Sequence, residues 1–179
     1  MAEAFFQATA WTMDTPKPYG AFHLVLTVLG VSLSIFLARK FSFPERKAGP
    51  DTILFLCGLF LGLTELYKQG FIYYIENGRT YDWWYFPFQL CSVPMYLGLF
   101  IPMVPARIRN VFYLFIQDFG LLGGIMALAE PSGLMHPYWT MTVHGFLWHF
   151  NLIFMGLICA FYNLKTETPK SYLHTIPLF

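Results

Sequence analysis

Apolar residues lie in five long runs that are separated by short polar segments. Each run holds about 20 residues with few charges, the length that an α-helix needs to cross a hydrocarbon core about 30 Å thick. We therefore expect an all-α, polytopic transmembrane helix bundle that forms a single domain over residues 1–179. The predicted spans are residues 19–38, 52–71, 83–104, 110–129 and 138–163.

Two features modify this simple pattern. Pro87 and Pro94 fall inside the third run and are expected to kink it, because proline cannot donate the helical hydrogen bond. The last residues, SYLHTIPLF, turn apolar again. They predict that a sixth span begins at the C-terminus and that the natural protein continues beyond it.

The composition supports a membrane protein. The chain is 56% hydrophobic, 20% aromatic and only 12% charged, whereas a soluble domain carries about 25% charged residues. This excludes an ordinary soluble enzyme, and the many aromatic residues exclude a disordered chain. The net charge is +1, and Lys and Arg cluster in only one short loop, so we predict no binding to nucleic acid.

The distribution of Lys and Arg over alternate loops predicts the orientation. One side has three such residues and the other has eight, and the richer side is expected to be cytoplasmic. The sequence thus predicts a multi-pass cell-membrane protein with its N-terminus outside. The three residues are Lys17, Lys68 and Arg79, and the eight are Arg39, Lys40, Arg46, Lys47, Arg107, Arg109, Lys165 and Lys170.

Small residues four apart predict close helix packing. Gly58 and Gly62 form such a pair in the second span, and Gly120 and Gly124 form one in the fourth. The missing side chains let two helix backbones approach each other.

Polar residues within the spans are the candidate functional residues, because such groups are costly in a bilayer and face the bundle interior or a cavity. At about 1.5 Å per residue, most of them lie roughly 9 to 16 Å below the outer ends of their spans, and Asp118 lies near mid-depth. We therefore expect one polar layer from four helices. Its members are Cys91, His144, His149, Glu65 and Asp118, joined by Gln89 and Asn151.

Nucleophilic catalysis is one use of such a layer. A histidine at the depth of Cys91 can take the thiol proton and later return it to a leaving group, with Asp118 or Glu65 orienting the ring. Donors to an oxyanion could come from Gln89, Asn151 or Trp148, and the sequence does not choose among them. The other cysteines, Cys57 and Cys159, are interpreted as packing residues.

Several of these residues also have simpler interpretations. His144 and His149 are about 140° apart around a helix, so we expect different faces and a packing role for one of them. Glu65 can pair with Lys68 or Gln69 one turn on. A metal site is a further option, but no tight motif supports it, and we predict neither a metal nor a cofactor.

Three segments carry a resemblance to a known family. The strings PYGAFHLVL, WWYFPFQLCSVPMYL and HGFLWHFNLIFMGL resemble the YwaF-like integral membrane proteins, relatives of eukaryotic transmembrane protein 164. The similarity is spread from about Tyr19 to Leu178. The resemblance implies a cysteine and a histidine that transfer phospholipid acyl chains, and these match Cys91 and His149, with His144 as the alternative. Family members usually continue for one or two further helices.

These observations lead to three hypotheses. The first is a lipid acyltransferase or acyl hydrolase with a Cys–His pair inside the bilayer and membrane lipid as its partner. The second is a non-enzymatic membrane carrier or binding protein whose cavity is lined by Glu65, Asp118 and the histidines. In the third, the polar layer only joins helices, at about 0.6 kcal/mol per hydrogen bond.

Overall fold

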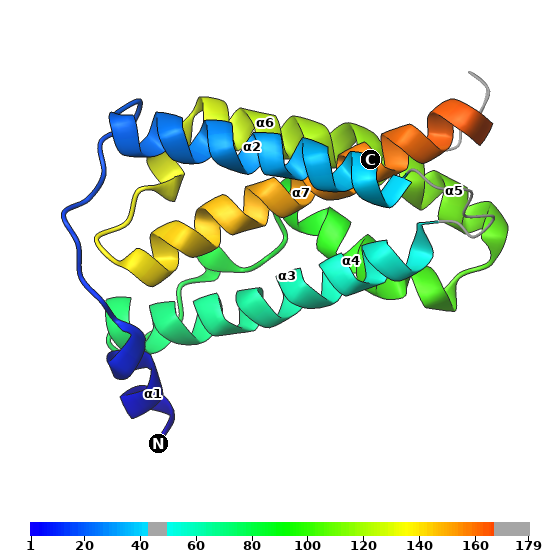
Figure 1. The fold of residues 1–179 in the computed structure, drawn as a ribbon. Coiled ribbons are helices and arrows are strands. Elements are labelled where there is room, and N and C mark those ends of the chain that lie inside the picture. The colour runs from blue at the N-terminus through cyan, green and yellow to red at the C-terminus, as the bar shows by residue number, and fades with distance from the viewer. Residues whose placement is uncertain (43–49, 167–179) are drawn as a thin grey trace.

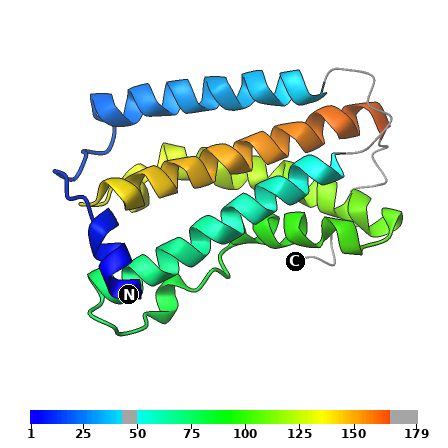
Figure 2. The same ribbon diagram turned by 60° about the horizontal axis from the view of Figure 1, so that its bottom comes forward.

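The computed structural model describes residues 1–42 and 50–166, without the side chains of residues 164–166. Within these residues the chain is helical and has no strand, apart from an isolated bridge between Thr12 and Tyr138. Figures 1 and 2 show the long helices running in roughly one direction, with α7 between α2 and α3. The predicted all-α class is thus confirmed. The predicted sixth span lies outside the described residues.

The helices follow the predicted runs closely in four cases out of five. A short helix, α1 (Ala2–Thr9), precedes them. The first two runs are α2 (Ala21–Ser42) and α3 (Asp51–Phe71), which continues into a π-helical turn, η1 (Ile72–Glu76). The fourth run is α5 (Ala106–Phe115), the π-helical turn η5 (Ile116–Gly120) and α6 (Leu121–Ala129), and the fifth is α7 (Trp139–Thr166), which follows η6 (Pro131–Leu134).

Three helices are long and apolar enough to cross a membrane among the described residues: Ala21–Ser42, Ala106–Ala129 and Trp139–Asn163. A fourth apolar helix, Leu90–Met103, is shorter, and α3 carries charges near both of its ends. Five complete crossings therefore remain a prediction.

The third predicted span is wrong in its first half. Residues 83–89 form a short 3₁₀ turn, η2 (Trp83–Tyr85), followed by extended backbone, and Phe86 has ψ 131°. The cause is Pro87, because a residue before proline disfavours the helical conformation. Helix starts only at η3 (Leu90–Ser92), α4 (Val93–Phe100) and η4 (Ile101–Met103). Pro94 lies in the first turn of α4, where no N–H is needed, so it begins a helix rather than kinking one.

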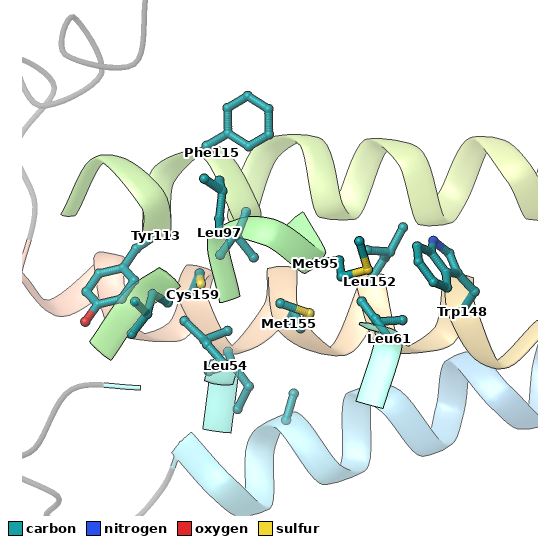
Figure 3. Packing of buried hydrophobic residues seen from close by; sticks show 14 residues of the cluster. Leu54, Leu61, Met95, Leu97, Tyr113, Phe115, Trp148, Leu152, Met155 and Cys159 are labelled. Carbon is teal, nitrogen blue, oxygen red and sulfur yellow. The ribbon is translucent and has the colours of Figure 1, made fainter. Parts of the chain in front are cut away.

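The core lies along α7. Leu61 from α3, Met95 from α4 and Leu152 and Met155 from α7 are buried together (Figure 3). The helix α2 packs mainly on α7 and leaves Val28, Leu33 and neighbouring side chains exposed, as expected of a helix that faces lipid.

The N-terminal segment crosses the end of the bundle where α7 begins. Phe6 of α1 lies over Gly70 of α3, and the Thr9 hydroxyl is 2.6 Å from the Tyr67 hydroxyl. Farther along, the amide of Trp139 donates to the carbonyl of Trp11 at 2.9 Å. This fixes the start of α7, the helix that carries both candidate histidines.

Candidate functional site

A cavity of about 510 Å³ lies at the end of the bundle where α3 and α6 end and α7 begins. Its volume falls within the range of about 300–1,000 Å³ that is usual for small-molecule sites. Much of the lining is polar, which is costly within a membrane protein unless the groups serve a ligand or one another. The polar lining residues are Lys68, Gln89, Cys91, Ser92, Glu130, Ser132, His136, His144 and His149.

One wall of the cavity is formed by residues 83–92, which consist of the 3₁₀ turns η2 and η3 joined by extended backbone and which we call the strap. It passes inward from the bundle end, and its carbonyls are held by distant side chains. The Gln69 amide donates to the Tyr85 carbonyl at 2.5 Å, and the Tyr96 hydroxyl donates to the Pro87 carbonyl at 2.9 Å. Irregular backbone at membrane depth occurs where it lines a cavity, so the strap and the cavity form one feature.

Cys91 lies at the inner end of the strap. Its β-carbon is 3.7 Å from the position that a β-carbon on Gly123 would take, six residues from the end of α6 and therefore about 9 Å deep. The thiol donates to the Gln89 side-chain oxygen at 3.7 Å. The inner end of the strap thus lies directly against α6 at Gly123.

His149 lines the cavity from α7. Its Nδ1 is 2.7 Å from the Gly145 carbonyl. A carbonyl only accepts hydrogen bonds, so Nδ1 carries the proton, and in the neutral ring Nε2 holds the lone pair. Gly124 packs against the carbonyl of His149, and the adjacent Gly123 contacts Cys91. Two consecutive glycines of α6 therefore bring the strap and α7 to the same cavity.

The two histidines lie about 140° apart around α7, as expected, but they share one cavity. Both line the cavity, together with residues spaced at i, i+3, i+4, i+7 and i+8 along α7. Such positions form one continuous stripe on a helix, and the histidines are its two edges. The angle of about 140° between the two histidines is therefore the angular width of the α7 surface that lines the cavity. The stripe consists of Met141, His144, Gly145, Trp148 and His149.

Glu65 pairs with its neighbours, as the simpler interpretation predicted. Its side chain is 4% exposed and accepts from Lys68 Nζ at 2.8 Å and from Gln69 Nε2 at 2.7 Å. Lys68 lines the cavity and lies 5.9 Å from the centre of the Trp148 ring. Glu65 thus places a positive charge at the cavity wall without lining the cavity itself.

Asp118 does not join the polar layer. Its side chain is exposed, hydrogen-bonded to the Gln117 amide at 3.1 Å, on the outward face that also carries exposed Leu122 and Ile125. Asp118 lies in the π-helical turn η5, and a turn of that kind shifts the direction of the side chains that follow its start. Residue counting predicted how deep Asp118 lies along its helix, but it did not predict on which side of the helix the side chain lies.

Asn151 is also outside the cavity lining. Its amide donates to the Cys57 carbonyl at 3.3 Å and so joins α7 to α3. Asn151 therefore does not act as the oxyanion donor, one of the roles that the sequence suggested for it.

Replacing Asp118 with asparagine is expected to leave the function of the cavity unchanged within about twofold, because exposed positions away from a site tolerate substitution. The measurement is the rate of lipid acyl transfer, or the binding of a lipid ligand, by the purified variant in detergent. Abolished binding or flux in the Asp118→Asn variant would instead support the carrier hypothesis.

Sequence reasoning missed the outer end of the cavity. Glu130, Ser132 and His136 line it from the loop between α6 and α7. Hydrogen bonds from Ser132 hold the pKa of the Glu130 carboxyl below its ordinary value, so it is ionised at neutral pH. The sequence places the loop that carries Glu130, Ser132 and His136 at the same end of the bundle as the strap, and this position could have identified them as lining residues. Among the described residues, no group of three or more His, Cys, Asp or Glu side chains could hold a metal ion.

A comparison with protein families gives one match. The model of the TMEM164 family matches residues 18–179 of the chain. Neither a curated protein nor a solved structure shows a significant match.

Proposed function

The chain belongs to the TMEM164 family of membrane proteins, and on this premise we propose that it is a lipid acyltransferase or acyl hydrolase with Cys91 as nucleophile and His149 as base. The observation that carries the proposal is the shared cavity: the thiol and the imidazole, 58 residues apart in the chain, line the same polar space. A thiol needs such a base to react as a thiolate.

The proposed chemistry begins with proton transfer. His149 Nε2 takes the Cys91 proton, and the sulfur attacks the carbonyl carbon of a lipid ester while the carbonyl electron pair moves to oxygen. Collapse of this intermediate breaks the ester C–O bond, and the leaving alkoxide takes the proton from His149. The acyl group is then a thioester on Cys91, and water or a second alcohol removes it by the same steps in reverse.

The residues around the cavity support a lipid substrate whose ester group enters the cavity while its acyl tails stay outside. Polar side chains line part of the cavity, and the strap adds the exposed aromatic side chains of Trp83, Trp84 and Phe88, of which Trp84 also lines the cavity. Such aromatic side chains favour the membrane interface. The acyl tails would thus stay in the bilayer while the ester reaches Cys91. The cavity lies at the bundle end where Lys68 and Arg79 are found. The distribution of Lys and Arg over the loops supports an opening of the proposed site on the outer side of the cell membrane.

The direct test is to trap the thioester. Purified protein in detergent is mixed with a phospholipid that carries an alkyne-tagged acyl chain, quenched with acid and digested. We expect a tag on the peptide that contains Cys91, and neutral hydroxylamine should release it as it releases thioesters. A tag that hydroxylamine does not release, a tag on Cys57 or Cys159 instead, or no tag at all would overturn the proposal.

A further inference from the structure

His144 lines the cavity and has a buried ring nitrogen without a hydrogen-bond partner among the described residues. The residue lines the cavity from α7, and its ring lies 5.6 Å from that of Trp148 at an interplanar angle of 39°. The Nε2 atom is buried and has no hydrogen-bond partner among the residues that the structure describes. A buried polar atom without a partner is unfavourable, so its partner is expected to be a group that enters the cavity.

The hydrogen bonds of the neighbouring groups leave a role for this nitrogen. Nδ1 of His149 is held by the Gly145 carbonyl, which leaves Nε2 of that ring to act on the Cys91 proton. Asn151 donates to the Cys57 carbonyl instead of the cavity. The proposed reaction needs a donor for the oxygen that becomes negative when sulfur attacks the carbonyl carbon, and His144 lines the cavity together with Gln89 and Trp148, the other donors that the sequence offered.

We propose that His144 is this oxyanion donor. The inference rests on the proposed function. In it, the Nε2–H of His144 donates to the carbonyl oxygen of the lipid ester, and the hydrogen bond strengthens as that oxygen gains the electron pair. No proton moves from His144: the thiol proton goes to His149 and from there to the leaving alkoxide. The two edges of the α7 stripe therefore have separate roles, one histidine as base and the other as electrostatic stabiliser.

The test compares two reactions of the same thiol. Acyl transfer from a phospholipid passes through an oxyanion, whereas disulfide exchange with a lipid-tailed methanethiosulfonate does not, although both need the thiolate. We expect His144→Phe to lower the rate constant for thioester formation by about 10²-fold, with KM little changed. Its methanethiosulfonate labelling should match that of the wild type. His144→Gln, which retains an N–H donor, should restore much of the acyl transfer.

The control is His149→Gln, which should slow both reactions because it removes the base. If His144→Phe does not fold, as judged by its elution and melting in detergent, His144→Met provides a second apolar variant. Equal loss of both reactions in the apolar variants, or an unchanged rate of thioester formation, would overturn the role of His144. Failure of the proposed function is a different result, because the wild type itself would then form no thioester.

Discussion

Replacing Cys91 with alanine is expected to lower lipid acyl transfer by about 10³-fold or more, because removing a nucleophile from a catalytic pair abolishes the covalent route. The variant should also form no hydroxylamine-sensitive thioester. The side chain is half-buried and differs from alanine by one sulfur atom, so the variant is expected to fold normally. The measurement is the initial rate of acyl release from a tagged phospholipid in detergent micelles.

The matched control is Cys57→Ala. Cys57 is also a half-buried thiol that packs against the core, but unlike Cys91 it does not line the cavity. Its contact with Asn151 uses the backbone carbonyl, which alanine retains. Its acyl transfer should therefore remain near that of the wild type. Equal activity of the Cys91→Ala variant and the wild type would refute the nucleophile, and equal loss in both variants would indicate a general effect on the fold.

The double variant Cys91→Ala/His149→Gln adds a check on the pairing. A base contributes about 10²–10⁴-fold, but only while its nucleophile is present. The double variant should therefore be no slower than Cys91→Ala alone. Additive losses would mean that the two residues act independently.

The sequence predicts the helices of the bundle because backbone groups in lipid must be satisfied within the segment itself, so an apolar run of about 20 residues has few alternatives to helix. That argument fails for residues 83–89. Their carbonyls are satisfied by Gln69 and Tyr96, which lie on other elements. The hydropathy of a segment does not show hydrogen-bond partners that come from other elements. Pro87 was the local signal, and it indicated extended backbone rather than a kink.

The candidate site was predictable in depth but not in direction. Counting residues placed Cys91, His144 and His149 in one layer, and all three line the cavity. The count for Cys91 assumed one continuous helix, whereas Cys91 lies in the 3₁₀ turn η3 that follows extended backbone. The same counting failed for Asp118, since a position along an axis says nothing about the side of the helix on which it lies. The direction of the Asp118 side chain depends on the π-helical turn η5, which the residue pattern does not predict.

The glycine pairs illustrate how a correct pattern can contain unequal members. Gly58 and Gly62 are one turn apart on α3 and look equivalent in the sequence. A β-carbon on Gly58 would lie 2.8 Å from the Leu99 amide nitrogen and 2.9 Å from the Met95 carbonyl oxygen. A β-carbon on Gly62 would meet only the end of the Leu99 side chain, at 3.6 Å.

Gly58→Ala is therefore expected to destabilise the bundle by about 3 kcal/mol, the upper part of the range for overpacking, because backbone of α4 cannot move aside as a side chain can. Gly62→Ala should be neutral or slightly stabilising, since alanine favours helix over glycine. The measurement is the unfolding free energy of each variant, by titration of detergent-solubilised protein with denaturing detergent.

Because α4 follows directly after the strap, Gly58→Ala should also loosen the position of Cys91 and reduce acyl transfer in the protein that remains folded. Equal stability of the two variants would show that α3 and α4 do not make this close approach.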